Sequence, residues 1–458
     1  MTVVVFGCGP MNCEPEFSVL APGARTWQIV QTVVNGLVLA EVKEPRVIVC
    51  ALDSQPRPHS SRPLRFSIPS EFPTGEGPAP SVSIDYVPLP IEDFKKAGTG
   101  AFEGGPAPDE PIHAVVATGS VQPWATAAEF AAVRQAPLWV DVFGDPLAEI
   151  QSRAELYLDQ KTENDSLYWH SVKLMLRALL GGDRFSSLSS RQRFSVIGQL
   201  GVAGRLNRLT KAYEFVYSIP YGVFESTAPP LPASVEHPYF TVMWCGSFNT
   251  WMDVETLALG LVRAWREYRR LRVRIVGGRC ADYNDRSFNQ FIELVRREGA
   301  TQMIEVLDWQ PLGALQKLYA ECDIGLSIDR PTYEALLGSR TRFIHFLLAG
   351  KPVISTAITE LAEELAEAGA LLPFRAGDAD DLARAVLEAA HSRTQLAERA
   401  EALRKYVFER FNGRVVGAPL MEWLAAPTWA PDKSAADHSL DLANPLTSYW
   451  SRVLAQAP

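Results

Sequence analysis

The chain has 458 residues, of which 47% are hydrophobic and 21% are charged. That composition is typical of a folded globular protein of two or three domains, and it excludes the disordered, collagen-like and coiled-coil classes. With 44 Lys and Arg against 53 Asp and Glu, the formal net charge is -9, so we do not expect a nucleic-acid partner.

Two further properties describe the setting of the protein. No apolar run approaches the ~20 residues of a transmembrane helix, so we expect no transmembrane segment. The six cysteines are scattered at positions 8, 13, 50, 245, 280 and 322 and form no CxxC pair. This spacing fits neither a zinc site nor a disulfide framework, and it predicts a reducing, cytoplasmic location.

Short apolar runs alternate with helical patterns along the whole chain. In the first half the expected strands cover residues 3–6, 46–51, 85–87, 113–117 and 137–141. In the second half they cover residues 239–244, 273–276, 304–307, 323–327 and 352–355. Strands that are apolar on both faces and separated by helices are typical of parallel sheets, so the pattern predicts two doubly wound α/β domains.

A proline-rich segment separates the two series of strands, with prolines at 220, 229, 230, 232 and 238. Such a segment forms a semi-rigid connector between domains. We therefore predict a first domain over residues 1–228, a second over 239–415, and a tail over 416–458 that packs back on the body.

A glycine-containing turn follows the first expected strand. Gly7, Cys8 and Gly9 begin like a dinucleotide-binding fingerprint, but Asn12 stands where the third glycine belongs. The turn still lets a ligand approach the backbone, so a ligand loop that includes Gly7, Gly9 and Arg25 and a plain tight turn both stay open. The sequence contains no P-loop, HExxH, GxSxG or paired acidic motif, so we expect no metal site.

The second half contains a candidate phosphate loop. The strand at 239–244 runs into a turn at Gly246, followed by Ser247, and Asn249 and Thr250 then stand as expected helix caps. Apolar residues recur at helical spacing from Val254 onward. A capped helix N-terminus at the carboxyl end of a parallel strand is a favourable site for phosphate oxygens.

A second helix start lies at residues 339–342. Ser339 is the expected cap, and Arg340, Thr341 and Arg342 follow it. Arginines at the positive end of a helix cost stability unless an anion lies between them and the backbone N–H groups. The pattern therefore favours a bound diphosphate, while solvent-facing arginines with acidic partners remain the alternative.

At this point the chain resembles a known family. The run RTRFIHFLLAGKPVIST is similar to the K-L-x-E-Y-L-A-x-G-K-P-V-I signature of GT-B glycosyltransferases, specifically the retaining family 4, the glycosyl transferases group 1. Four further segments follow that family in order and spacing, so that the resemblance covers about 240–410: GSFNTWMDVETLALGLVRAW, LRVRIVGG, LQKLYAECDIGLSID and AEELAEAGALLPFRAGDADDLARAV.

The resemblance implies an α/β protein of the GT-B fold, with two Rossmann-like domains that face a central cleft. It implies a nucleotide-sugar donor, a UDP- or GDP-sugar, in the second domain and an acceptor in the first, beside the loop of Gly7, Gly9 and Arg25. It also implies that Gly246 begins the donor-phosphate loop and that Arg342 lies near the diphosphate. His345 takes the place of the second glutamate of the family's spaced pair. The register of the first glutamate falls on Leu337, so Glu334 is the nearest candidate.

The sequence also departs from the family. Ser247 and Asp253 occupy the places of a basic pair that usually follows the phosphate-loop glycine. If the site is active, Arg340, Arg342 and Arg279 must supply that charge, beside the polar donor-binding candidates Asn249, Thr250, Ser339 and Thr341.

The resemblance implies transfer with retention, without a metal and without any cofactor beyond the donor. The leaving phosphate can then take the acceptor proton, so no strong protein base is required. Inversion would require one, and Asp141 and His170 are the candidates. We count Asp141, His345 and Glu334 as the candidate catalytic residues.

Two other functions stay open. The altered glutamate pair and the missing basic pair would also fit a catalytically silent GT-B protein that binds nucleotide or a partner transferase. A nucleotide-sugar epimerase is the third possibility. The sequence leaves open whether the acceptor is a small molecule or a glycan, as in carbohydrate or natural-product biosynthesis, and whether the protein forms a homodimer.

Overall fold

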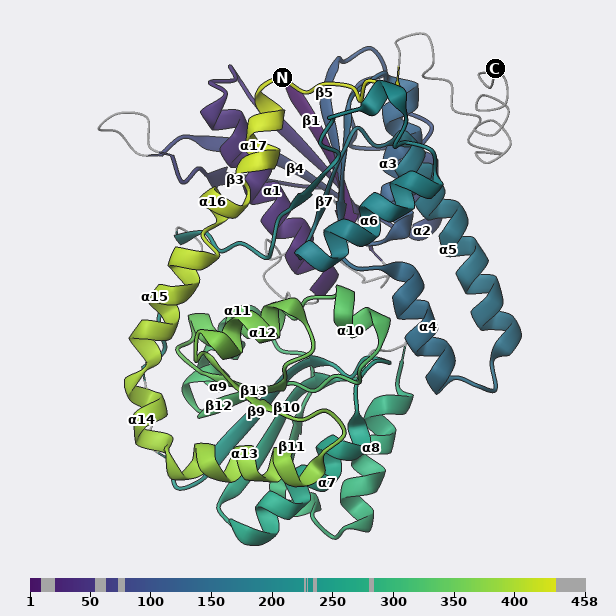
Figure 1. Ribbon diagram of the computed structural model, residues 1–458. Coiled ribbons are helices and arrows are strands. Elements are labelled where there is room, and N and C mark those ends of the chain that lie inside the picture. The colour runs from purple at the N-terminus through teal and green to yellow at the C-terminus, as the bar shows by residue number, and fades with distance from the viewer. Residues whose placement is uncertain are drawn as a thin grey trace.

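The computed structural model describes residues 1–9, 21–53, 63–72, 79–225, 228, 230–233, 237–279 and 284–433. It has two α/β lobes, which lie one above the other in Figure 1. Part of the first glycine-containing turn, residues 10–20, lies outside the described residues, as do Cys13, Cys280 and the tail after residue 433. Within the described part, no helix is both long and apolar enough to cross a bilayer.

The first lobe is built on a sheet of eight strands in the described residues, in the order β3-β4-β2-β1-β5-β6-β7-β8. All neighbouring pairs are parallel except β3 and β4. The strands are β1 (Thr2–Cys8), β2 (Arg46–Leu52), β3 (Leu64–Pro69), β4 (Ser81–Leu89), β5 (Ile112–Ala117), β6 (Leu138–Val142), β7 (Arg184–Ser187) and β8 (Val216–Ser218).

Helices cover both faces of this sheet, which is why its strands are apolar on both sides. They are α1 (Ala21–Leu39), α2 (Ile91–Ala97), α3 (Val121–Arg134), α4 (Pro146–Leu156), α5 (Lys161–Gly181) and α6 (Ser190–Val202). Val3 and Val5 of β1 pack in the same core as α1, whereas Val4 and Phe6 pack in the core of α2, α3 and α5.

The second lobe holds a parallel sheet of six described strands, in the order β11-β10-β9-β12-β13-β14. The strands are β9 (Phe240–Ser247), β10 (Leu271–Gly278), β11 (Ile304–Leu307), β12 (Ile324–Leu326), β13 (Val353–Thr356) and β14 (Leu371–Phe374). The helices around it are α7 (Val254–Glu267), α8 (Arg286–Arg297), α9 (Leu312–Ala320), α10 (Tyr333–Leu337), α11 (Thr341–Leu348), α12 (Glu360–Glu367), α13 (Ala379–His391), α14 (Arg393–Glu398) and α15 (Ala400–Arg410).

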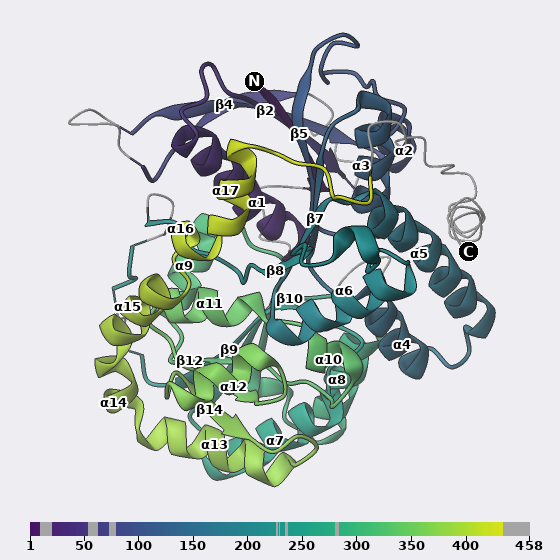
Figure 2. The same ribbon diagram turned by 45° about the horizontal axis from the view of Figure 1, so that its top comes forward.

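After α15 the chain returns to the first lobe, as the yellow ribbon in Figure 2 shows. The crossing is marked by a β-bridge between Val223 and Asn412. Beyond it, α16 (Gly413–Val416) and α17 (Ala418–Ala425) pack against α1. Farther along, Asp432 forms a buried ion pair with Arg205, 2.6 Å between Oδ2 and Nε. Up to residue 433, the predicted tail therefore contacts the first lobe.

The loops after the strands of the first sheet face the second lobe. After β7, the hydroxyl of Ser189 donates to the carbonyl of Leu337 at 3.2 Å. The backbone N–H groups of Ser190 and Arg191, at the start of α6, donate to the Glu360 carboxylate of α12 at 2.9 Å each. A cavity of about 290 Å³ lies beside these contacts, and it is also lined by Pro220 and Tyr221 of the segment that joins the lobes. The predicted central cleft is thus formed by the loop edges of the two lobes.

Candidate functional site

The phosphate loop lies where β9 ends. Gly246 has φ +113°, a left-handed conformation that glycine adopts without strain. A Cβ at this position would lie 3.5 Å from Nη2 of Arg342, so the guanidinium packs directly on the loop backbone. The same nitrogen donates to the carbonyl of Ser247 at 3.4 Å. The structure thus brings together three of the residues that the sequence predicts for the donor site.

Arg342 is a cation without an anionic partner. No carboxylate lies within ion-pair distance of it among the described residues, and its Nη1 is buried without a hydrogen-bond partner. Its guanidinium carbon lies 4.4 Å from the ring centroid of Trp244. Burial, together with the nearby charge of Arg340, lowers the pKa of Arg342 to about 10, so it stays protonated at neutral pH.

Arg340 differs sharply from its neighbour. Its guanidinium donates to both oxygens of Glu334, at 3.0 and 2.7 Å, and to both oxygens of Asp329, at 3.0 and 3.1 Å. All three side chains are buried. Two carboxylates bind Arg340, and their charge exceeds its single positive charge, so the predicted donor contacts of Arg340 and Glu334 are corrected to a structural ion triad.

Three buried polar atoms of the second lobe lack a hydrogen-bond partner, and they are its only such side-chain atoms within the described residues: Oγ1 of Thr250, Nε of Arg330 and Nη1 of Arg342. Arg330 and Thr250 are neighbours, because Nη2 of Arg330 donates to the Thr250 carbonyl at 2.6 Å. Buried unpaired polar groups are costly and call for an explanation. They lie on the loops after β9 and β12 and at the start of α11, where a polar ligand could form hydrogen bonds with them.

Arg330 is a residue that the sequence reasoning missed. The signal lay in the segment that follows the expected strand at 323–327, where a cation stands at the carboxyl end of a parallel strand. Thr250, by contrast, is among the predicted donor residues.

The helix caps differ from those expected. The cap of α7 is Asp253, whose carboxylate accepts from the N–H of Thr256 at 3.0 Å. Asn249 and Thr250 lie in the preceding loop, where Asn249 accepts from the Ser247 hydroxyl at 2.9 Å. At α11 the cap position belongs to Arg340 and no side chain caps the helix, so the predicted cap at Ser339 is wrong.

The remaining predicted donor residues are spread around this loop. Arg279 follows β10, whose Gly278 pairs with Ser247, and it is exposed. Thr341 is the half-buried first residue of α11. Ser339 is half-buried and lines the cavity of about 290 Å³ beside Tyr221. Their contacts with a donor stay a prediction.

His345 lies beside Tyr221 of the segment that joins the two lobes. Its ring centroid is 5.3 Å from that of Tyr221, and burial lowers its pKa to about 4. His345 is therefore neutral at pH 7, which suits a hydrogen bond to a ligand but supplies no charge.

Asp141 and Arg25 form a buried pair in the core of the first lobe. Both side chains are 0% exposed. Nε of Arg25 donates to Oδ2 of Asp141 at 2.9 Å, and the hydroxyls of Thr118 and Ser186 donate to the carboxylate at 2.6 and 2.7 Å. The Asp141 oxygens accept from all of these donors and are closed off from solvent, so a base at this residue does not fit the structure.

The predicted loop of Gly7, Gly9 and Arg25 is also corrected. Arg25 lies within α1, and Gly7 is buried in β1, where a Cβ would collide with Thr26. Gly9 follows the strand, and its N–H donates to the carbonyl of Leu52 at 2.8 Å. Gly7 therefore serves the close packing of α1 on β1.

A carboxyl group that the sequence reasoning overlooked lies on the first-lobe side of the cleft. Glu149 is half-buried in the first turn of α4, so close to Gly144 that a Cβ there would meet its Oε1. Burial, together with the charges of Glu334 and Asp145, raises the pKa of Glu149 to about 8. The signal was an acid just after a strand end, in the segment 145–149.

No cluster of three or more His, Cys, Asp or Glu that could hold a metal ion lies among the described residues. The predicted metal independence stays a prediction.

Comparison with known families supports the second lobe directly. Residues 239–392, about a third of the chain, match the family model of glycosyl transferases group 1. The match confirms the resemblance to the glycosyl transferases group 1 that the sequence motifs predict.

Solved structures share the fold of the whole described chain. Sucrose-phosphate synthase from Thermosynechococcus elongatus is 14% identical, with 92% of this chain and 97% of that one covered and a TM-score of 0.60. HepE from Anabaena, in complex with UDP and glucose, is 14% identical, with 93% of this chain and 100% of that one covered and a TM-score of 0.61. A glycosyltransferase from Rickettsia africae is 14% identical, with 93% of this chain and 99% of that one covered and a TM-score of 0.54. The predicted GT-B fold is thereby confirmed. No curated protein sequence matches the chain.

We expect Asp141→Ala to destabilise the protein without weakening donor binding. The substitution leaves the charge of Arg25 buried and unpaired, which costs about 3–5 kcal/mol. Denaturant unfolding measures the stability, and calorimetry with UDP measures binding to the folded protein. Asp93→Ala, which breaks an exposed pair with Lys96, is the control and should cost less than about 1 kcal/mol. A stable Asp141→Ala protein that binds UDP but has lost its activity would restore the catalytic interpretation.

We expect Glu149 to make stability fall as pH rises. Because the pKa of Glu149 is raised from 4.5 to about 8, the folded protein holds a proton between these values that the unfolded chain releases. Its contribution is therefore fully present below about pH 4.5 and is lost by about pH 8. Thermal unfolding between pH 5 and 9 should show a steeper loss for the native protein than for Glu149→Gln. Parallel curves would contradict the shift.

Proposed function

We propose that the protein is a glycosyltransferase that moves a sugar from a nucleoside diphosphate sugar to an acceptor bound in the first lobe. The observation that carries the proposal is the half-buried guanidinium of Arg342, which forms no ion pair with a described residue and lies on the backbone of Gly246 and Ser247. A partly buried cation that forms no ion pair within the protein is stabilised by a ligand anion, and a diphosphate supplies two negatively charged phosphate groups.

A UDP-sugar is the proposed donor. HepE from Anabaena, which shares the fold along its whole length, was solved with UDP and glucose. A GDP-sugar remains the alternative, because the base-binding residues of the chain are not assigned. The acceptor would enter from the first lobe.

In this arrangement Arg342 would meet the negative charge that develops on the leaving diphosphate. The unpaired hydrogen-bonding atoms of Thr250 and Arg330 would add polar contacts nearby. Groups that are already positioned for a developing charge lower the barrier most, and removal of one typically costs about 2.7–4 kcal/mol.

Retention and metal independence are part of the proposal. Asp141 and Glu334 are both fully engaged by arginines, so neither is free to deprotonate an acceptor. Glu149 is mostly protonated at pH 7, with its pKa of about 8, so it would donate rather than accept a hydrogen bond. Retention, in which the leaving phosphate can take the acceptor proton, agrees with these environments. A cytoplasmic location and a homodimer remain predictions.

The proposal is tested by incubating the protein with UDP-, GDP- and TDP-sugars and following nucleotide release with and without candidate acceptors. A transferase releases nucleotide in an acceptor-dependent manner. Donor binding without release on any acceptor would favour the silent GT-B protein, and sugar isomerisation without acceptor would favour the epimerase. The absence of any donor binding would overturn all three functions.

Arg342→Ala should weaken UDP binding while stability stays nearly unchanged. The loss of charge-assisted hydrogen bonds of about 1.5–3 kcal/mol corresponds to a roughly 10- to 150-fold higher dissociation constant. Calorimetry measures the affinity, and thermal unfolding without nucleotide measures the stability. Arg297→Ala, at an exposed arginine of α8, is the control and should bind UDP normally. Unchanged affinity together with lost stability would show that Arg342 is a structural arginine.

A further inference from the structure

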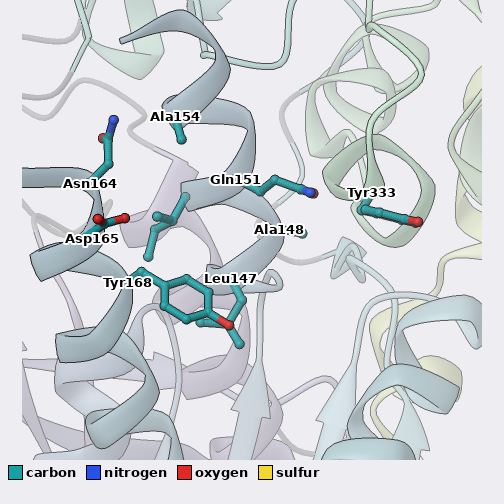
Figure 3. A pocket seen from close by; sticks show the side chains of 9 residues that line it. Leu147, Ala148, Gln151, Ala154, Asn164, Asp165, Tyr168 and Tyr333 are labelled. Carbon is teal, nitrogen blue, oxygen red and sulfur yellow. The ribbon is translucent and has the colours of Figure 1, made fainter. Parts of the chain in front are cut away.

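A second cavity, of about 390 Å³, lies between α4 and α5 of the first lobe and is closed on one side by α10 of the second. Figure 3 shows Leu147, Ala148, Gln151 and Ala154 along α4, with Tyr168 beside them on the neighbouring helix. The side chain of Gln151 extends toward the helix that carries Tyr333. Residues from both lobes thus form the walls of this cavity.

The lining is mainly apolar and aromatic. It consists of Leu147, Ala148, Ile150, Ala154, Tyr168 and Tyr333, with Gln151, Asn164 and Asp165 as the polar members. Ligand pockets typically have this character and a volume of roughly 300–1,000 Å³. Tyr333 is 64% exposed, so a ligand in the cavity can reach its ring. The cavity therefore favours an apolar group with a few hydroxyls, and the carboxylate of Asp165 disfavours an anion.

The cavity adjoins the cleft. The first turn of α4 contributes Leu147 and Ala148 to the cavity and also carries Glu149. On the other side, Tyr333 directly precedes Glu334, which binds Arg340. Glu149 and Glu334 are close enough that the charge of one raises the pKa of the other. A molecule in the cavity would thus extend toward the region between the two lobes where Glu149 and Glu334 lie.

The α4–α5 hairpin is held on the donor lobe at its far end. The hydroxyl of Tyr157 donates to Oδ1 of Asn284 at 2.9 Å, and Asp159 pairs with Arg286. Arg330 pairs with Glu155 of α4 at 3.3 Å. Arg330 also donates to the carbonyl of Thr250, so one side chain contacts both the loop of Thr250 and the helix α4 that lines the cavity.

We propose that this cavity binds the apolar part of the acceptor, an aryl or short alkyl group attached to a hydroxyl-bearing portion that reaches the cleft. The inference rests on the proposed function, since it assigns the cavity to the acceptor of that reaction. It specifies an amphiphilic acceptor and excludes a free sugar as the preferred one, because a free sugar would leave the apolar walls uncovered.

The test uses the full chain and a neutral apolar probe, N-phenyl-1-naphthylamine, whose fluorescence reports binding. Ala154 is half-buried on the cavity wall, so Ala154→Trp fills the cavity from its edge. We expect the probe to bind the native protein saturably and Ala154→Trp roughly 10- to 100-fold more weakly, since several buried CH₂-sized contacts are lost. Ala132→Trp, at a half-buried alanine of α3, is the matched control and should bind normally.

Tyr333→Ala is a second variant, at an exposed position where folding is not at risk. Tyr333→Ala should also weaken the binding of the probe. On the native protein, 4-nitrophenyl β-D-glucoside and octyl β-D-glucoside should displace the probe. With UDP-glucose as donor, these two glucosides should stimulate UDP release more than free glucose does, and the aryl and alkyl arms distinguish the two kinds of apolar group.

Equal probe binding by the native protein and Ala154→Trp would overturn the proposal, as would absence of probe binding to the native protein. Stimulation by free glucose equal to that by the glucosides would also overturn it. UDP binding is measured on every variant in the same experiment. Intact UDP binding with a failed probe experiment refutes only the acceptor cavity, whereas a native protein that does not bind UDP refutes the proposed function itself.

Discussion

The donor site depends on an unequal division of negative charge between two arginines that are two residues apart. Asp329 and Glu334 both bind Arg340 and hold it in the body of the second lobe. No described carboxylate binds Arg342, although its guanidinium is packed between the Trp244 ring and the backbone of the Gly246 turn. The triad fixes the start of α11, and α11 places Arg342, which forms no ion pair with a described residue, on the phosphate loop. One arginine therefore positions the helix and the other is left for an anion.

The two lobes share this site through side chains that cross the cleft. Glu360 of the second lobe accepts hydrogen bonds from the start of α6 in the first, where an anion is favourable at the helix N-terminus. On the opposite side, Arg330 joins α4 to the loop of Thr250. Nucleotide binding at the unpaired atoms of Arg330 and Thr250 would therefore change the position of Arg330 and, through its ion pair with Glu155, that of the α4–α5 hairpin. This connection offers a physical route from the donor to the acceptor side.

The sequence predicts the fold well because buried parallel strands leave a strong apolar signal. It does not predict β3, an antiparallel edge strand with mostly exposed residues, or the short strands β7, β8 and β14, which have four, three and four residues. Within the site, Gly246 and Arg342 could be found because strand-end glycines and helix-start arginines are local patterns. The involvement of Asp141 with Arg25 could not, since the two residues are 116 positions apart and the pairing is made by tertiary structure. The same holds for Glu149, whose raised pKa arises from burial and from charges of both lobes.

The central claim is that a diphosphate binds the charge of Arg342, and calorimetry of the native protein with UDP, UMP and uridine tests it most directly. If Arg342 and the unpaired atoms around it bind the diphosphate, affinity should rise steeply from uridine to UDP, and the advantage of UDP should shrink as salt screens the charges. Equal affinity for uridine and UDP, or no dependence on salt, would contradict the account.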